Sequence, residues 1–138
     1  MLYLGIDSGT QSTKSIVLDL ESGKILATAQ KTYDLVPGLP PGHMEQEPQD
    51  WINATEATIL ECLQKVESRK SEVRAIGVSG QQHGLVVLND ANEVIRPAKL
   101  WCDTSTANAE NSESSGKCGV SACKMGTTTC SNVSLRRA

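Results

Sequence analysis

The feature that most constrains the fold is the opening of the chain, where three short apolar runs are separated by two turns. Apolar residues alternate from Leu2 to Ile6, and the runs Ser15 to Leu20 and Ile25 to Tyr33 are rich in β-branched and other apolar residues. Such runs are typical of strands, and the Gly- and Ser-containing segments between them are typical of turns. We therefore predict a three-stranded antiparallel meander at the N-terminus.

Beyond a loop rich in Pro and Gly, the pattern changes to that of a helix. Pro48 suits a first helical turn, and Asp50 suits the positive end of the helix dipole. The apolar residues that follow recur near helical spacing, which predicts one helix from about Gln49 to Ser68.

After this helix, further strands are expected. A turn at Asn89–Asn92 would join two of them, and Pro97 would interrupt the last, as suits a sheet edge. The predicted strands are Val73–Ser79, Gly84–Leu88 and Val94–Leu100.

The composition and the residue pattern of the chain change near residue 109. Residues 1–109 carry the strand and helix patterns, whereas residues 110–138 are dense in Ser, Thr, Gly, Cys and Lys without either period. Such a composition does not bury enough apolar surface to offset the entropy of ordering. We predict a folded domain over residues 1–109 and a disordered or aberrant tail over residues 110–138.

Charge and cysteine content exclude several classes of protein. The net charge is −3 with both signs mixed along the chain, which offers no basic surface for nucleic acid or for a membrane. No signal peptide pattern is present at the N-terminus, so we expect a cytoplasmic protein. The odd count of 5 Cys does not indicate a disulfide framework. Cys102, Cys118, Cys123 and Cys130 lack the paired spacing of structural zinc sites. The oligomeric state stays open.

The first motif follows the opening strand directly. Gly9 lets the backbone bend tightly and lets a phosphate come close, and successive N–H groups in such a turn form an anion-binding concavity. Thr10 adds a hydroxyl donor, and Asp7 offers a carboxylate to a hydrated Mg²⁺ ion. The alternative is an ordinary hairpin turn with a polar cap. The remaining residues of this predicted phosphate turn are Gln11, Ser12 and Lys14.

The second motif is a polar loop between two predicted strands, Gly77–Val86. Its centre, Gln81 to His83, offers amide and imidazole groups that suit the recognition of hydroxyls. Gly80 and Gly84 permit a sharp reversal and the close approach of a ligand. The alternative is a connecting loop with solvated side chains, but the flanking apolar strands favour a site at the strand end.

These motifs together resemble the FGGY family of carbohydrate kinases. The segment Gly5–Thr10 is similar to the family's first phosphate motif, although Ser8 stands where a larger or apolar residue is common. Gly77–Gly84 resembles the signature of the xylulose kinases within that family. Glu45–Trp51 and Arg96–Asp103 resemble two further family stretches in the right order. The resemblance implies an α/β, RNase H-like fold of the actin and hexokinase type, here as a partial N-terminal domain with a meander, a helix and further strands.

The resemblance also implies roles for individual residues. Asp7 would be catalytic and would lie at the metal and phosphate site, and Gly9 and Thr10 would hold the phosphates of ATP. Gln82 and His83 would contact the ketose. Trp101 and Asp103 would lie near the sugar, although core packing and helix capping are alternatives for these two.

By this resemblance, the expected reaction is the ATP- and Mg²⁺-dependent phosphorylation of D-xylulose to D-xylulose 5-phosphate. Family members are longer, and their general base lies further along than this chain reaches, so we expect a truncated copy that is inactive alone. The alternatives are a non-catalytic fragment that binds sugar or a partner, another FGGY kinase acting on ribulose, gluconate or glycerol, and an actin-like ATPase. The Gln81 to His83 cluster argues against the last, since it suits a polyol.

Overall fold

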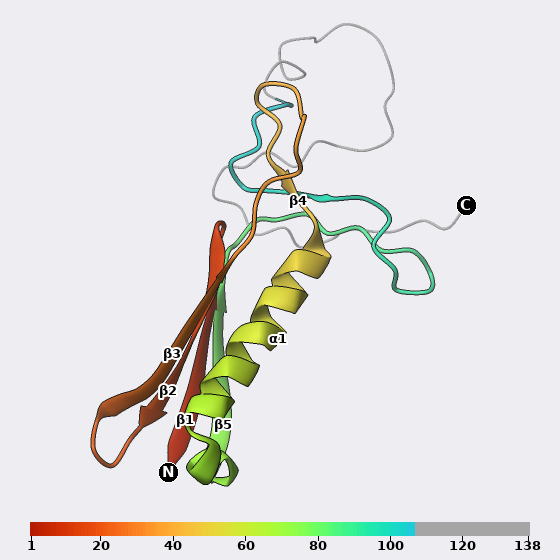
Figure 1. The fold of residues 1–138 in the computed structure, drawn as a ribbon. Helices are drawn as coiled ribbons and strands as arrows, with labels where there is room; N and C mark the ends of the chain where they lie inside the picture. The colour runs from red at the N-terminus through yellow and green to blue at the C-terminus, as the bar shows by residue number, and fades with distance from the viewer. Residues whose placement is uncertain (107–138) are drawn as a thin grey trace, which may run out of the picture. The chain divides into compact units, whose positions relative to one another are not determined.

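The computed structural model describes residues 1–106 (Figure 1). The predicted N-terminal meander is confirmed, because the first three strands pair antiparallel in the order in which they occur. In chain order the elements are β1 (Leu2–Ser8), β2 (Ser12–Asp19), β3 (Lys24–Thr32), β4 (Glu45–Gln46), α1 (Pro48–Lys65), the 3-10 helix η1 (Glu67–Glu72), β5 (Val73–Gly80) and β6 (Ala98–Lys99).

The main sheet has four strands in the order β3-β2-β1-β5. The chain leaves β3, passes through α1 and η1, and returns in β5, which lies parallel to β1. The register pairs Asp7 with Ser79 and Ser8 with Gly80. Because parallel strands end at the same edge of a sheet, the turn after β1 and the loop after β5 leave the sheet side by side.

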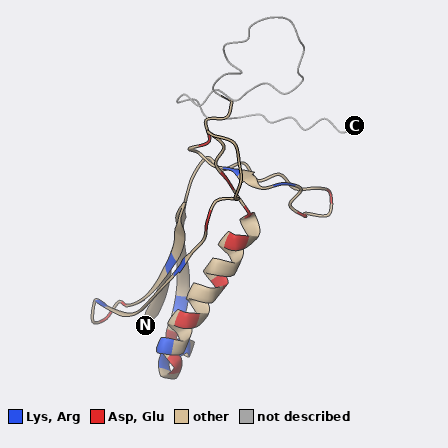
Figure 2. Cartoon of the chain, turned by 45° about the horizontal axis from the view of Figure 1, so that its top comes forward, with Lys and Arg blue, Asp and Glu red and all other residues tan. Residues whose placement is uncertain are grey.

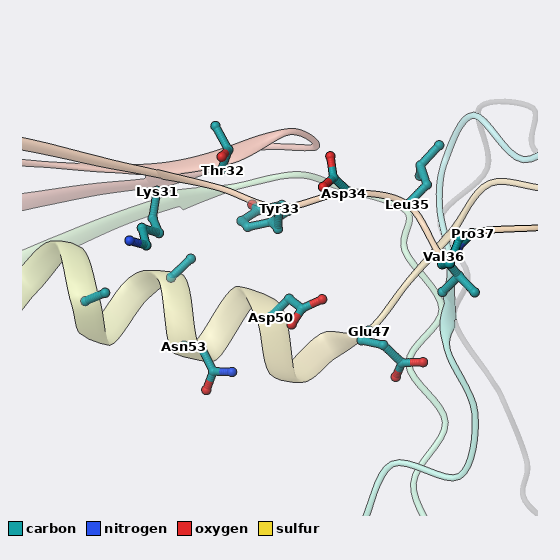
Figure 3. Close-up of a pocket in the computed structure, with 12 residues that line it drawn as sticks. Lys31, Thr32, Tyr33, Asp34, Leu35, Val36, Pro37, Glu47, Asp50 and Asn53 are labelled. Carbon is teal, nitrogen blue, oxygen red and sulfur yellow. The ribbon is translucent and has the colours of Figure 1, made fainter.

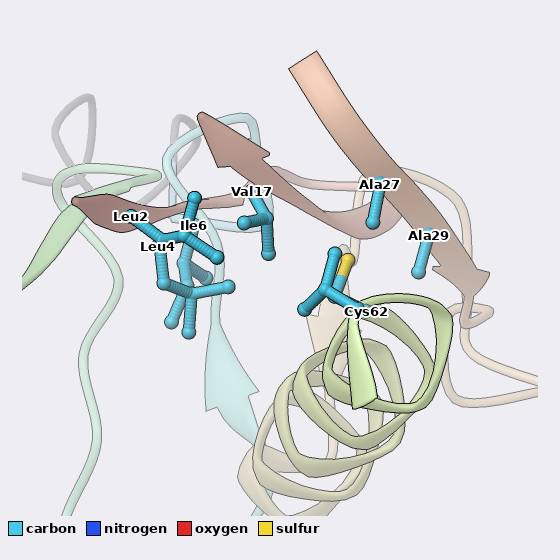
Figure 4. Close-up of a cluster of buried hydrophobic side chains, with 8 residues drawn as sticks. Leu2, Leu4, Ile6, Val17, Ala27, Ala29 and Cys62 are labelled. Atoms are coloured by element: carbon cyan, nitrogen blue, oxygen red, sulfur yellow. The ribbon is translucent and has the colours of Figure 1, made fainter. Parts of the chain in front are cut away.

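The core lies between one face of this sheet and α1 (Figure 4). Alternate side chains of β1 point toward the helix, and Leu2, Leu4 and Ile6 are between 0% and 7% exposed. The small residues Ala27 and Ala29 of β3 let the helix approach the sheet closely. The sequence thus folds here because strand alternation and helical spacing place their apolar faces against each other.

The helix begins and ends near the predicted positions, and small or polar side chains make up much of its buried face. Ala54, Thr58 and Cys62 recur at intervals of four and face the sheet, whereas Ile52 and Leu60 are 51% and 60% exposed. The hydroxyl of the buried Thr58 lies 2.8 Å from that of Ser15 in β2, so its polar atom is paired. A small, partly polar face is therefore what packs against the sheet.

Charges at the two ends of α1 complement the helix dipole. Asp50 lies in the first turn and Lys65 in the last, where it contacts Glu61 at 2.7 Å. Figure 2 shows acidic residues along α1 and basic residues around its C-terminal end. No helix within residues 1–106 is long and apolar enough to span a bilayer.

The predicted strands at 84–88 and 94–100 are wrong. Two isolated bridges, Leu85 to Lys99 and Leu88 to Val94, are all that this stretch contributes apart from the two residues of β6. The apolar side chains that suggested strands stay exposed, with Leu85 at 62% and Ile95 at 58%. Residues with high strand propensity do not form a ladder of strand hydrogen bonds when their side chains have no apolar face to pack against. The Asn89–Asn92 turn is confirmed, because the Asn92 N–H donates to the Asn89 carbonyl at 2.9 Å.

A second, two-stranded sheet joins β4 to β6, with Glu45 opposite Lys99 and Gln46 opposite Ala98. The sequence did not predict β4, because a strand of two residues has no readable period. Gln46 is only 1% exposed. This small sheet holds the segment before α1 against the segment that carries Trp101.

Candidate functional site

The turn after β1 and the loop after β5 line one cavity of about 400 Å³. The parallel pairing of the two strands explains why residues so far apart in sequence meet there. Most of the predicted site residues line this cavity, and no residue of the loop before α1 does. The lining residues are Asp7, Gly9, Thr10, Gly80, Gln81, Gln82, His83 and Trp101.

The turn between β1 and β2 is closed by a hydrogen bond from the Gly9 N–H to the Ser12 carbonyl at 3.0 Å. The backbone of Gly9 is not left-handed, and a Cβ atom placed there would meet only the Ser12 carbonyl oxygen at 3.5 Å, an ordinary contact. Bending therefore does not require glycine at this position. What the missing side chain provides is room beside the backbone on the cavity.

Asp7, the last residue but one of β1, has an exposed side chain that borders two hollows. One is the 400 Å³ cavity, and the other is a depression of about 470 Å³ on the sheet face away from α1. Lys14 lines this second hollow and stands opposite Asp7 in the strand register. Asp7 makes no ion pair with any residue in the described part of the chain, so its carboxylate is available to a ligand.

Two other residues of the predicted phosphate turn lie beside the cavity rather than in it. The Gln11 carbonyl accepts a hydrogen bond from the Tyr33 N–H at 3.2 Å. The Ser12 hydroxyl accepts one from the Gln30 amide at 3.2 Å. The exposed side chain of Gln11 is not among the cavity-lining groups.

The loop after β5 is tied to β1 by a bond from the Gln81 N–H to the Ser8 carbonyl at 2.8 Å. Both amide atoms of the Gln81 side chain are buried without a hydrogen-bond partner within residues 1–106. A buried amide left unpaired is costly, so this side chain is suited to a polar ligand. Gln82 and His83 are exposed, and His83 has a left-handed backbone with φ 59°.

Trp101 binds the turn after β1 and lines the cavity. Its indole N–H donates to the Thr10 hydroxyl at 3.1 Å, and the side chain lines the cavity while 54% of the residue stays exposed. An aromatic ring in this position presents an apolar face beside polar groups, which suits a sugar.

Asp103 does not line the cavity. Its carboxylate accepts bonds from the Met44 N–H at 2.8 Å, from the Ser105 N–H at 3.0 Å and from the Lys99 ammonium at 3.2 Å. Burial raises the pKa of the Asp103 carboxyl, but the bonds from Ser105, Met44 and Lys99 outweigh this effect and hold the pKa well below its usual range. The geometry indicates a carboxylate that holds the loop beside Trp101.

One cluster near Asp103 has the composition of a metal site. Ligand atoms of His43, Glu45 and Asp103 lie within 4.8 Å of one another. However, the Glu45 carboxylate already binds Arg96 at 2.7 Å, and Lys99 lies 3.5 Å from Glu45 and 3.2 Å from Asp103. Two side-chain cations neutralise the acidic groups, so the cluster is an ion-pair network. Three of the four cysteines considered for zinc, from Cys118 onward, lie outside the described residues.

A larger hollow of about 660 Å³ lies between the chain after β3 and the first half of α1 (Figure 3). Asp34, Glu47 and Asp50 border it, and it shares no lining residue with the cavity that holds Asp7 and His83. Sequence analysis singled out no ligand-binding group there.

Two residues that hold the turn after β1 were not predicted, and a third stands out within the predicted loop. Tyr33 and Gln46 bond the turn after β1, and Gln81 carries the unpaired amide. Gln81 stands inside the recognised motif. Nothing in the sequence assigned Tyr33 or Gln46 to this turn, because the carbonyls that they bind lie 24 and 36 positions away.

Comparison with known proteins places the chain among sugar kinases. The profile of the FGGY family of carbohydrate kinases, N-terminal domain, matches residues 2–134. A xylulose kinase of Haemophilus influenzae is 40% identical over 110 residues, covering 77% of this chain and 22% of that protein. A xylulose kinase sequence of an Arthrobacter species is 35% identical over 106 residues, covering 77% of this chain and 98% of that sequence.

Solved structures agree on the fold. A "xyloylose kinase" of Brucella ovis superimposes with a TM-score of 0.72 at 34% identity, covering 80% of this chain and 23% of that one. A gluconate kinase of Lactobacillus acidophilus gives a TM-score of 0.67 at 28% identity, with 80% and 23% covered. The predicted fold class is confirmed. The chain spans about a fifth of the length of most full relatives, such as the 22% of the Haemophilus protein. The predicted boundary at residue 109 and the tail after it stay predictions.

Proposed function

Because the chain belongs to the FGGY family of carbohydrate kinases, we propose that it carries one wall of the site of an ATP-dependent D-xylulose kinase, which forms D-xylulose 5-phosphate. The observation that carries this proposal is the single cavity shared by Asp7, Thr10 and His83. A kinase must bring a phosphate-binding turn and a sugar-binding loop within reach of each other, and this cavity does so.

On the phosphate side, the turn after β1 supports the binding of ATP. Gly9 leaves its backbone accessible, and Thr10 adds a hydroxyl. The unpaired carboxylate of Asp7 fits Mg²⁺, which prefers oxygen ligands and keeps several waters. When bound, this ion neutralises charge on the phosphates. Lys14, which borders the hollow on the other side of Asp7, would bind phosphate oxygens, and Gln11 and Ser12 would shape the turn.

On the sugar side, Gln82 and His83 would hydrogen-bond hydroxyls of the ketose. Both residues are exposed and line the cavity, and the buried side-chain amide of Gln81, which also lines it, has no partner among the described residues. Trp101 would cover an apolar face of the sugar. Asp103 would act on the sugar only indirectly, by holding the loop that carries Trp101.

Phosphoryl transfer also needs a group that takes the proton of the attacking hydroxyl. In the reaction the sugar oxygen forms a bond to the γ-phosphorus, the bond from that phosphorus to the bridging oxygen breaks, and ADP leaves. Asp7 is the one carboxylate that lines the cavity within residues 1–106, and it stands at the phosphate turn. We therefore expect the general base to come from outside this part of the chain.

Because Asp7 is the one carboxylate that lines the cavity within residues 1–106, a second candidate function is a module that binds D-xylulose without phosphorylating it. A coupled assay for ADP release with D-xylulose, D-ribulose, gluconate and glycerol, run beside calorimetric titration of each compound, separates the two. Heat of binding with D-xylulose and no ADP release supports the module. Turnover by the chain alone contradicts our assignment of the base, and binding of another sugar in preference to D-xylulose contradicts the substrate. A cytoplasmic location stays a prediction.

A further inference from the structure

We propose that Tyr33 and Gln46 are positioning residues that hold the turn after β1 in its phosphate-binding form. Each donates a side-chain hydrogen bond to a carbonyl of the turn, and together they direct the N–H groups of Thr10 and Gln11 away from the protein interior. The inference rests on the proposed function, since it assigns to that turn the binding of phosphate.

Tyr33 reaches the turn from the end of β3. Its hydroxyl donates to the Gly9 carbonyl and accepts from the buried Thr13 hydroxyl at 3.5 Å. Its own N–H donates to the Gln11 carbonyl at 3.2 Å. The residue is 9% exposed, so one largely buried tyrosine fixes two of the three carbonyls in the turn.

Gln46, in β4, binds the third carbonyl of the turn, that of Thr10. Its side-chain nitrogen donates to the Thr10 carbonyl at 2.7 Å, and its side-chain oxygen accepts from the Trp51 indole at 3.0 Å. An indole N–H only donates, so it sets the orientation of the Gln46 amide and leaves the NH₂ group facing the turn. Gln46 is 1% exposed, which keeps water from competing for these bonds.

The peptide geometry connects these bonds to phosphate binding. In a trans peptide the C=O of one residue and the N–H of the next point in opposite directions, and the described residues contain no cis peptide. The Gly9 carbonyl therefore sets the direction of the Thr10 N–H, and the Thr10 carbonyl sets that of the Gln11 N–H. Neither N–H donates a hydrogen bond within residues 1–106. Carbonyls bound on the inside thus present successive N–H groups on the outside, as an anion requires.

The competing explanation is that Tyr33 and Gln46 only stabilise the fold. Matched variants separate the two explanations, because the chain has 2 Tyr. Tyr33→Phe removes one hydroxyl, and Tyr3→Phe is its control, since the Tyr3 hydroxyl makes no hydrogen bond in the described part of the chain. Gln46→Met removes the amide at nearly constant volume, and Gln49→Met is its control on the exposed start of α1.

The test is backbone amide NMR of the chain, first alone and then titrated with MgADP and with inorganic pyrophosphate. Without ligand, we expect the Thr10 and Gln11 amides to become more mobile in Tyr33→Phe and Gln46→Met but not in the controls. With either ligand, we expect affinity measured at these amides to fall about 3- to 10-fold, the effect of losing one neutral hydrogen bond. Melting temperatures measured in parallel identify effects on global stability.

The outcomes distinguish the two proposals. If Thr10 and Gln11 of the unmodified chain do not respond to either ligand, the phosphate turn itself is refuted. If they respond, but Tyr33→Phe and Gln46→Met bind as their controls do, the turn stands and the positioning role is overturned. A loss of affinity in proportion to a loss of melting temperature in all four variants also overturns it, since that result needs only a structural role.

Discussion

Asp7 at the end of β1 and His83, three residues beyond the end of β5, line the same cavity although 76 positions separate them in sequence. The parallel pairing of β1 with β5 brings them together, because Ser8 pairs with Gly80 at the shared edge of the sheet. A carboxylate that suits a metal-bound phosphate and an imidazole that suits a hydroxyl are thereby placed on one side of the fold.

Replacing Gly9 by Ala tests whether this glycine serves the ligand rather than the backbone. A Cβ atom there meets only the Ser12 carbonyl at 3.5 Å, so the free energy of unfolding should stay constant or rise by up to about 1 kcal/mol. Affinity for MgADP should fall about 10-fold, because the methyl group occupies space beside the turn.

The matched control is Gly23→Ala in the turn between β2 and β3. Gly23 has φ +67°, and a Cβ atom placed there would meet no atom within 4 Å. It should lower the free energy of unfolding by about 1 kcal/mol and leave MgADP affinity unchanged. Urea unfolding and calorimetry measure both quantities. The reverse pattern, with Gly9→Ala destabilised and still binding, would refute the assignment.

His83→Asn tests the sugar-facing loop with little backbone strain, since Asn tolerates the left-handed region that His83 occupies at φ 59°. We expect affinity for D-xylulose to fall about 10-fold or more, with MgADP affinity and melting temperature unchanged. His43→Asn, at the other of the 2 His, is the control and should bind the sugar normally. Equal effects of the two variants on D-xylulose binding would contradict the role of His83.

Asp103→Asn tests the ion-pair network that holds the loop with Trp101. Asn keeps the shape but loses the charge that binds Lys99, so the free energy of unfolding at pH 7 should fall by about 2 kcal/mol. The effect on D-xylulose affinity should be smaller than that of His83→Asn. A loss of sugar binding without a loss of stability would instead place Asp103 in direct contact with the sugar.

The same residue predicts a pH dependence of stability. The folded-state pKa of Asp103 is lowered from an ordinary value of 3.8, so its contribution is present above that value and is lost as the pH falls toward the folded-state pKa. Below about pH 4 the difference in unfolding free energy between the unmodified chain and Asp103→Asn should therefore shrink. Urea titrations at a series of pH values measure this difference in unfolding free energy. A difference that grows on acidification would contradict a lowered pKa of Asp103 in the folded state.

The β5 edge of the main sheet, which no other strand within residues 1–106 covers, predicts self-association. In β5, Val78 is 72% exposed and Ile76 is 58% exposed, and the strand pairs only with β1 within residues 1–106. Exposed apolar residues on an unpaired edge favour edge-to-edge contacts. Val78→Thr should raise the concentration at which light scattering detects assembly, without changing the melting temperature. Ile52→Thr on α1 is the control, because Ile52 is equally apolar and 51% exposed but lies on a helix.

The sequence predicted the parts of this fold that depend on local pattern. The meander and the turn at Asn89–Asn92 follow from alternation and turn chemistry, and both are present. Neither the parallel return of β5 nor the two-residue β4 has a local signal. The helix was placed well by the spacing of its apolar residues. The burial of Ala54 and Thr58 had no signal of that kind, because these two residues suit the sheet by their small size rather than by hydrophobicity.

For the site, the sequence supplied the groups but not their arrangement. The polar clusters around Asp7 and His83 could be found as motifs, and their common cavity could be known only once β5 paired with β1. Asp103 was grouped with the sugar-binding residues, yet the structure surrounds it with donors from Met44, Lys99 and Ser105. A side chain's partners depend on tertiary contacts that no spacing encodes.

The most direct measurement is a pair of amide NMR titrations of the chain, one with MgATP and one with D-xylulose. The nucleotide should shift the amides of Gly9 to Gln11, and the sugar should shift those of Gln81 to His83. Mn²⁺ in place of Mg²⁺ should broaden the signals around Asp7 most strongly and those of Gln81 to His83 as well. If the sugar instead shifts residues around the separate hollow near Asp50, or if Mn²⁺ broadens Asp7 and leaves Gln81 to His83 sharp, the two motifs do not form one site.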